Sequence, residues 1–130
     1  MQLVSVEHKD GVQFSVRIGK HALTIDHPAD EGGQDGGPSP PELLVAALGG
    51  CMGYYMARYC QTIHQECKGL CIDLVPELSE DGKRVQRITI DVTPPDGFPA
   101  ERVKALLRAA DQCVVHNTLR QAPEIDIEVV

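Results

Sequence analysis

The sequence predicts an α+β fold with the element order β-β-β-α-β-β-α-β. In two separate groups of short segments, apolar and polar residues alternate with a period of two, as in half-buried strands. Each group is followed by a segment with helical signals, either a capped apolar run or apolar residues spaced along one helix face. Turns rich in glycine or proline separate these elements. At 130 residues, the chain is expected to be a single domain, residues 1–130.

Residues 1–26 are expected to form an antiparallel three-stranded meander. Short segments rich in β-branched residues are joined by turns that contain glycine, which adopts positive φ angles at little cost. The predicted strands are residues 3–6, 12–18 and 22–25, and Arg17 lies in the second of them. The following residues, 27–39, contain glycines among acidic side chains and are expected to form a loop.

A central helix is predicted over residues 40–66. Ser39 is a favourable N-cap, the two prolines that follow suit the first turn, and Glu42 stands three residues after the cap as in a capping box. The start of this helix is therefore well specified by the sequence.

The run that follows the cap, residues 43–56, is apolar on all sides. Such a run predicts a helix that is buried all round. Gly49, Gly50 and Gly53 each cost helix stability, by roughly 1 kcal/mol relative to alanine, but leave room for another backbone. We expect a tightly crossed partner helix to explain them.

Residues 69–130 are expected to contain a hairpin, a helix and a C-terminal strand. The hairpin is predicted from two alternating segments around the turn at Ser79 to Gly82. Pro99 begins a helix with apolar residues on one face, and the alternation of residues 125–129 predicts the last strand.

Composition excludes several classes of function. The net charge is −7, and the twelve basic residues form no cluster, which argues against nucleic acid and anionic membranes as partners. The N-terminus lacks a basic region followed by a long apolar run, and no stretch approaches eighteen consecutive apolar residues. A soluble cytoplasmic protein is expected.

Five cysteines are an odd number, and a chain kept in a reducing compartment is a poor candidate for a disulfide framework. The cysteines can then be reactive thiols, buried thiols or metal ligands. Cys60 and His64 share a helical face at a spacing of four residues, and with Cys67 and Cys71 they could hold zinc. Paired Cys-x-x-Cys spacing is missing, however, and Cys71 falls in an alternating strand, so we expect no metal and no cofactor.

Two segments resemble the osmotically induced protein C (OsmC) superfamily. The first is Pro-Ser-Pro-Pro-Glu-Leu-Leu-Val-Ala-Ala-Leu-Gly-Gly-Cys, ending at Cys51, and the second is Cys-Val-Val-His-Asn-Thr-Leu, beginning at Cys113. The order of elements also matches over nearly the whole chain. The resemblance implies an intertwined α+β homodimer with central buried helices. It also implies reduction of organic hydroperoxides through two cysteines, with electrons from a dithiol such as a lipoyl group.

One departure separates the chain from the organic-hydroperoxide-resistance branch. That branch carries an arginine in a Gly-Gly-Arg-Asp-Gly-like segment near its N-terminus, and this chain has no such segment. The second cysteine segment, with His116 after it, looks closer to the OsmC-like branch. Arg17 is the candidate substitute for the missing arginine, and Arg58 is an alternative.

The resemblance gives Cys51 the role of the reacting thiolate and Cys113 that of the thiol that resolves its sulfenic acid. Each could instead be an ordinary buried thiol. Because Cys51 lies about nine residues into its helix, the dipole of that helix cannot stabilise a thiolate, so a neighbouring cation is expected to do so. Glu42 would orient this arginine, although its capping role already accounts for it.

Glu42 and Cys51 are separated by about 13 Å along a straight helix and by roughly 180° around it. They cannot share a site within one chain. If both belong to one site, Glu42 must come from a second subunit, which is a second argument for a homodimer.

The expected function is therefore a thiol-dependent peroxidase that defends against oxidative stress. Its partners would be an organic hydroperoxide and a dithiol reductant, and Tyr54 and Tyr55 could line a pocket for bulky peroxides. The alternative is a non-catalytic module of the same fold that binds a small ligand or senses oxidants, and the missing arginine segment favours it. A zinc-binding module is the third reading.

Overall fold

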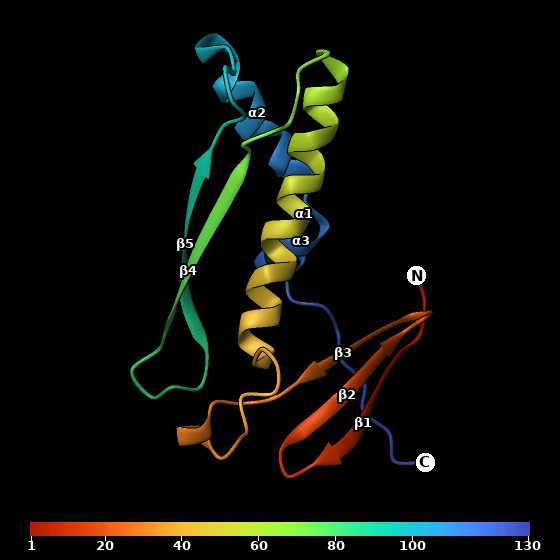
Figure 1. The fold of residues 1–130 in the computed structure, drawn as a ribbon. Coiled ribbons are helices and arrows are strands. Elements are labelled where there is room, and N and C mark those ends of the chain that lie inside the picture. The colour runs from red at the N-terminus through yellow and green to blue at the C-terminus, as the bar shows by residue number, and fades with distance from the viewer. The chain divides into compact units, whose positions relative to one another are not determined.

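The computed structural model describes residues 1–130, which divide into two compact units, Met1–Leu44 and Val45–Val130. The fold is α+β, as the sequence predicts, with a three-stranded sheet in the first unit and a two-stranded sheet in the second (Figure 1). None of the helices combines the length and apolar character needed to span a membrane.

The first unit contains the predicted antiparallel meander. Its strands pair in the order β1-β2-β3, and Val16 lies opposite Val6 on one side and Leu23 on the other. Gly11 and Gly19 have φ angles of 53° and 57° at the two turns, as the sequence predicts. The strands are β1 (Val4–Asp10), β2 (Gln13–Ile18) and β3 (His21–Ile25).

The loop after β3 is organised around the buried carboxylate of Asp26. Its oxygens accept hydrogen bonds from the side chain of Gln13 and from the backbone N–H groups of His27, Gln34 and Gly36, at 2.8 to 3.2 Å. These donors hold the pKa of Asp26 at about 2, with the Gly36 and His27 N–H groups contributing most. The loop therefore folds around one charged side chain, and it contains the short 3₁₀ helix η1 (Ala29–Glu31).

Helix α1 (Pro40–Thr62) begins where the cap predicts and ends four residues before the predicted residue 66. The Ser39 hydroxyl donates a hydrogen bond to the Glu42 carboxylate, and the Ser39 carbonyl accepts from the N–H of Leu43. The helix ends early because His64 adopts a φ angle of +56°. His64 is therefore outside the helix, and the predicted helical face shared with Cys60 does not exist.

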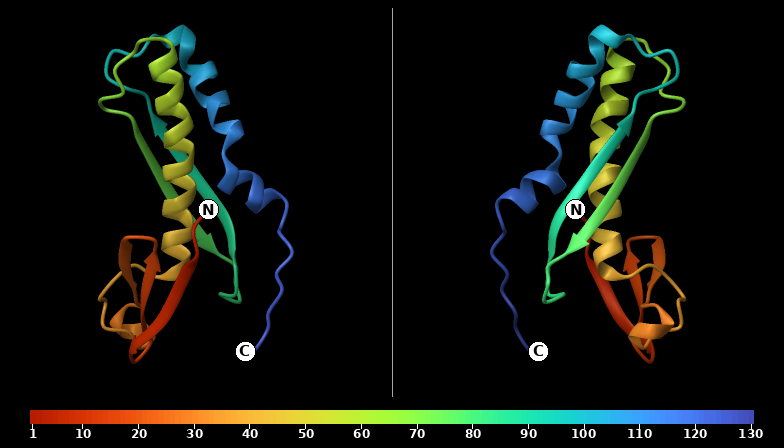
Figure 2. Two further views of the ribbon diagram at one scale, coloured as in Figure 1. Left: turned by 90° about the vertical axis from the view of Figure 1, so that its right-hand side faces the viewer. Right: turned by 90° about the vertical axis from the view of Figure 1, so that its left-hand side faces the viewer.

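The second unit consists of most of α1, the predicted hairpin and two short helices. The hairpin is antiparallel, with Leu74 opposite Ile90 and Ile72 opposite Val92. Figure 2 shows α2 running beside α1. The elements after α1 are β4 (Cys71–Leu78), β5 (Val85–Thr93), η2 (Ala100–Arg102), α2 (Val103–Ala109), η3 (Ala110–Gln112) and α3 (Val114–Arg120).

The core of this unit is one cluster. Met56, Leu106 and the two cysteines Cys60 and Cys113 are each 0% exposed within it. Half-buried apolar side chains of β4 and β5 pack against the cluster. Helices α1 and α2 thus lie side by side, and the hairpin packs against the core that they share (Figure 2).

Helix α1 is buried on one face rather than all round. Its buried residues include Val45, Leu48, Met52 and Met56, whereas Tyr54 is 54% exposed. Within one chain, the hairpin and α2 cover only part of the helix surface, so burial on every side, which is expected with a second subunit, stays a prediction.

Two of the three glycines of α1, Gly49 and Gly53, face the hairpin. A Cβ atom on Gly49 would lie 2.6 Å from Cδ1 of Leu74, and one on Gly53 would lie 3.4 Å from Cδ1 of Ile72. Gly50 has nothing within 4 Å. The predicted close crossing by a helix is therefore replaced, at Gly49 and Gly53, by the side chains of β4.

The C-terminal strand predicted for residues 125–129 is absent. Residues 121–130 follow α3 without forming a helix or strand (Figure 2). Alternation alone does not make a strand, because its backbone N–H and C=O groups need a neighbouring edge. Three apolar side chains of this segment, Ile125, Ile127 and Val129, remain exposed.

Candidate functional site

Cys51 and Cys113 are brought together in the second unit. Cys51 lies in the fourth turn of α1, and Cys113 is the N-cap residue of α3. Cys113 belongs to the buried core, and Cys51 packs against that core while staying partly exposed. Both are free thiols, and they lie near enough for each to shift the pKa of the other. The two residues singled out by the sequence motifs are therefore neighbours in space.

The pKa of Cys51 is lowered. Burial acts to raise it, but this effect is outweighed by the backbone N–H groups of Val115 and Val114 and by the Cys113 side chain, all of which favour the thiolate. These N–H groups belong to the first turn of α3, where no carbonyl within the helix can accept from them. The thiolate form of Cys51, a residue of α1, is thus favoured by the N-terminus of another helix, α3.

The pKa of Cys113 is raised. Burial is the main cause, and the neighbouring Cys51 adds to it, while the N–H of His116 opposes it by donating to the Cys113 sulfur at 3.3 Å. The pKa shifts of the two cysteines are opposite, so Cys51 is the thiol of the pair that loses its proton more readily. Such an arrangement suits one attacking and one resolving sulfur.

The source of this asymmetry was missed by the sequence analysis. A cation is expected near Cys51 from the sequence, whereas the groups that lower the Cys51 pKa within the chain are two backbone N–H groups and a thiol. The missing element is α3, which the sequence analysis did not predict. Its signal is weak, because cysteine is not one of the usual N-cap residues.

Arg17 and Glu42 belong to the first unit. Arg17, in β2, forms an exposed ion pair with Glu7 of β1 at 2.9 Å. Such pairs contribute about 0 to 1 kcal/mol, so Arg17 is only weakly held. Glu42, in the first turn of α1, accepts its hydrogen bond from Ser39.

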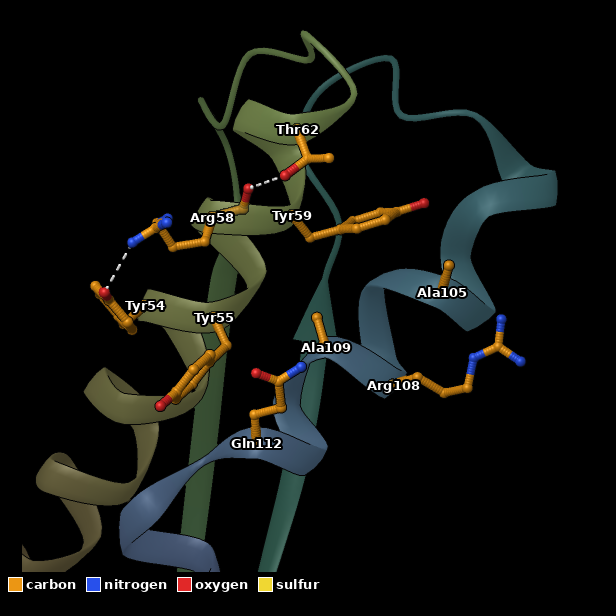
Figure 3. A pocket seen from close by; sticks show the side chains of 9 residues that line it. All are labelled: Tyr54, Tyr55, Arg58, Tyr59, Thr62, Ala105, Arg108, Ala109 and Gln112. Carbon is orange, nitrogen blue, oxygen red and sulfur yellow. Dashed lines mark hydrogen bonds between the residues drawn. The ribbon is translucent and has the colours of Figure 1, made fainter.

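A cavity of about 450 Å³ lies between the C-terminal half of α1 and α2 (Figure 3). Tyr54 and Tyr55 line it, with their rings edge to face at 5.0 Å between centroids. Arg58 donates to the Tyr54 hydroxyl at 3.0 Å, and Arg108 lines the α2 side. Neither Cys51 nor Cys113 lines this cavity.

The zinc reading receives no geometric support. No three His, Cys, Asp or Glu side chains gather closely enough to hold a metal ion. The sulfur of Cys71 lies 3.7 Å from the Asp73 carboxylate.

Comparison with known proteins identifies the family. The family model described as OsmC-like protein matches residues 32–128. The chain belongs to the OsmC-like family. No curated protein matches the sequence significantly.

Solved OsmC-like structures share the fold. A candidate osmotic stress induced and detoxification response protein from Psychrobacter arcticus is 20% identical with a TM-score of 0.82, covering 91% of this chain and 88% of its own. An OsmC-like protein from Mycoplasma pneumoniae is 15% identical with a TM-score of 0.76, covering 94% and 89%. The organic hydroperoxide resistance protein OsmC of Legionella pneumophila is 15% identical with a TM-score of 0.67, covering 93% and 90%. The OsmC-like fold predicted from the sequence is thereby confirmed.

Proposed function

We propose that this OsmC-like protein is a thiol-dependent peroxidase that reduces organic hydroperoxides through Cys51 and Cys113. The observation that carries the proposal is the contact between two free thiols whose pKa values are shifted in opposite directions. The family match and the Legionella relative named for organic hydroperoxide resistance support the choice of substrate.

In the proposed reaction, the Cys51 thiolate attacks the terminal oxygen of the hydroperoxide. The O–O bond breaks, the alkoxide takes up a proton and leaves as an alcohol, and Cys51 becomes a sulfenic acid. The Cys113 sulfur then attacks Cys51, an S–S bond forms, and hydroxide leaves with the Cys113 proton as water. An external dithiol reduces this disulfide by exchange and is itself oxidised to a disulfide.

The buried position of Cys113 fits the resolving role. A thiol with a raised pKa and no exposure is a poor target for peroxide, yet it is placed beside the sulfur that it must attack. Rapid resolution protects Cys51 from oxidation to the irreversible sulfinic acid.

The proposal includes a homodimer in which Arg17 and Glu42 act as positioning residues. The exposed apolar side chains Ile125, Ile127 and Val129 support an assembly that covers them. Glu42 of one subunit would orient Arg17 near the thiolate of the other. Sedimentation at micromolar concentration should show twice the chain mass, and a stable folded monomer would exclude a site shared between subunits.

Consumption of cumene hydroperoxide and hydrogen peroxide with dihydrolipoamide tests the peroxidase. Cys51→Ser should lower turnover by about a hundredfold or more, because serine is a far weaker nucleophile than the Cys51 thiol, whose pKa is lowered. Cys113→Ser should consume one equivalent of peroxide and then stall. Cys71→Ser removes an exposed thiol and should leave turnover unchanged. Equal turnover in Cys51→Ser and the unaltered protein would reject the proposal.

A second candidate function, binding of a small ligand without turnover, is favoured by the cavity between α1 and α2. Its lining contains the guanidinium groups of Arg58 and Arg108, neither of which forms an ion pair, and no carboxylate. Aromatic rings beside unpaired cations suit an anion with an apolar body (Figure 3).

Octanoate and benzoate are suitable probes for this second function. Either should raise the melting temperature of the unaltered protein, because a ligand that binds only the folded state stabilises it. The shift should be lost in Arg108→Ala and kept in Arg87→Ala, since Arg87 is paired with Glu77 outside the cavity. A shift that survives Arg108→Ala would place the ligand elsewhere.

A further inference from the structure

A second pair of neighbouring thiols lies at the C-terminal end of α1. Cys60 is in the last turn of the helix and is 0% exposed, whereas Cys67 lies beyond the helix and is partly exposed. Cys67 packs against the core cluster that contains Cys60, and it is near enough to contribute to the raised pKa of the Cys60 thiol. Both are free thiols.

The backbone turn that brings Cys67 back to the helix is a Schellman motif. The N–H of Gln65 donates to the carbonyl of Cys60 at 2.8 Å, and the N–H of His64 donates to the carbonyl of Gln61 at 3.2 Å. His64 holds the left-handed position that this motif requires. The carbonyl of Cys60 accepts the hydrogen bond from Gln65, so the segment that leads from the helix end to Cys67 is held at Cys60. This backbone contact keeps Cys67 near the Cys60 side chain.

We propose that Cys60 and Cys67 form a second redox-active dithiol, which a hydroperoxide oxidises at Cys67 and which then closes into an intramolecular disulfide. The order of events follows from exposure, because peroxide reaches the partly exposed sulfur of Cys67 and not the buried sulfur of Cys60. This dithiol is separate from the Cys51–Cys113 pair, since Cys60 lies nine residues beyond Cys51 on α1, about 13 Å along the axis.

The reaction balances with the hydroperoxide as the oxidant. The Cys67 thiolate takes the terminal oxygen, the O–O bond breaks, and the alcohol or water leaves with a proton. The Cys60 sulfur attacks the resulting sulfenic acid, the S–O bond breaks, and hydroxide combines with the Cys60 proton as water. Two thiols and one hydroperoxide thus give one disulfide, one alcohol and one water.

The closing step should be slow at neutral pH. Burial raises the pKa of Cys60 to about 11, and the adjacent Cys67 adds to the shift. Cys60 is therefore a neutral thiol under ordinary conditions. As long as the pH stays below that pKa, the rate of its attack should rise about tenfold for each unit by which the pH increases. The sulfenic acid of Cys67 should be trapped by dimedone more efficiently at pH 7 than at pH 9.

Trypsin separates the cysteines in a way that makes this proposal directly testable. Residues 59–68 form one tryptic peptide that contains both Cys60 and Cys67. Cys51, Cys71 and Cys113 fall in three other peptides, residues 21–58, 69–83 and 109–120. The disulfide therefore appears as a single peptide that has lost two hydrogen atoms.

The experiment treats the reduced full chain with hydrogen peroxide or cumene hydroperoxide, blocks remaining thiols with N-ethylmaleimide in denaturant, and digests without reduction. Peptide 59–68 should carry no maleimide and be lighter by two hydrogen atoms, and dithiothreitol should restore both thiols. Peptide 59–68 carrying two maleimides while Cys71 is already oxidised would overturn the proposal. So would a disulfide joining peptide 59–68 to peptide 69–83.

Variants separate this site from the peroxidase. Closure should persist in Cys51→Ser, and its loss there would overturn direct oxidation of Cys67. In Cys60→Ala, Cys67 should proceed to sulfinic acid, because no resolving thiol remains. In Cys67→Ser, Cys60 should stay reduced, whereas Cys71→Ser should leave closure unchanged. If Cys60→Ala unfolds, the unaltered protein and Cys51→Ser still decide the question.

Discussion

Cys113 is both the N-cap of helix α3 and the neighbour of Cys51. As the cap, it positions the N–H groups of Val114 and Val115 that face the Cys51 sulfur. Its own side chain is the second thiol of the pair. Two functions of the site thus depend on a single backbone position. The extended conformation of Cys113, with φ −61° and ψ 114°, turns the chain into the short helix. Without that turn, the N–H groups of Val114 and Val115 would not be directed at Cys51.

Removing one of these N–H groups should raise the pKa of Cys51. Proline at position 114 lacks the donor, and it is tolerated at the first position of a helix. The extended Cys113 before it already has the conformation that proline demands of its predecessor. A lost hydrogen bond of about 1 kcal/mol should slow alkylation of Cys51 by iodoacetamide roughly fivefold at pH 7.

Val114→Ala is the matched control for Val114→Pro. The Val114 side chain is 62% exposed, so its truncation should change little, and the backbone donor is kept. Alkylation of peptide 21–58 as a function of pH measures the Cys51 pKa in each variant. Identical pH profiles for the proline and alanine variants would show that the Val114 N–H does not stabilise the thiolate.

Asp26 should make the protein sensitive to acid. Its folded pKa of about 2 is below the ordinary value of 3.8, because the N–H groups of Gly36 and His27 favour its charged form. The charged form therefore stabilises the fold fully above pH 3.8, and this stabilisation is lost as the pH falls towards 2. Asp26→Asn should lose this dependence and melt roughly 5 °C or more below the unaltered protein at pH 7.

The difference in melting temperature between the unaltered protein and Asp26→Asn, followed from pH 7 to pH 2, isolates this one carboxylate. Asp30→Asn changes the same charge at an exposed position and should leave the melting temperature nearly unchanged. A difference that stays constant down to pH 2 would argue that Asp26 is not charged in the folded state.

The contrast between Cys51 and Asp26 shows what the sequence could reveal. Cys51 and Cys113 stood in recognisable motifs, so their pairing was expected before any geometry was known. The meander and the hairpin could also be predicted from the sequence, because alternation over several residues and turns with glycine are local signals of strands. Ser39 and Glu42 gave the start of α1 for the same reason, since the capping signal is local.

The features that were missed depend on partners distant in the sequence. Asp26 looked like an ordinary residue at the end of a strand, because its donors are backbone groups that carry no sequence signature. Helix α3 is only seven residues long, too short for a periodic pattern. For residues 125–129 the error is the reverse, because the sequence shows a strand pattern and the structure forms no strand there.

His64 offers a prediction about the end of α1. A residue with a side chain in the left-handed conformation costs about 1 to 2 kcal/mol, which glycine avoids. His64→Gly should therefore stabilise the protein by roughly 0.5 to 1 kcal/mol after the entropy of glycine is counted. Urea denaturation measures the change. His64→Ala keeps the conformational cost and should give no gain, and equal gains in the two variants would exclude this explanation.

Gly49 and Gly50 are adjacent in α1 but should respond in opposite ways to alanine. A Cβ on Gly49 would lie 2.6 Å from Cδ1 of Leu74, so the Leu74 side chain must leave its present packing, at a cost of about 1 to 3 kcal/mol. Gly50 has nothing within 4 Å, and Gly50→Ala should gain roughly 1 kcal/mol of helix propensity. Urea denaturation of both variants measures the two changes.

The pair of variants also tests whether a second subunit approaches α1 at Gly50. In a monomer, Gly50→Ala only strengthens the helix. If another helix crosses closely at this position in a homodimer, the new methyl group would separate the subunits, and Gly50→Ala would lower both stability and sedimentation coefficient. Gly49→Ala should lower stability in either case, because its contact lies within the chain. A stabilised dimer in Gly50→Ala would mean that the subunits meet elsewhere.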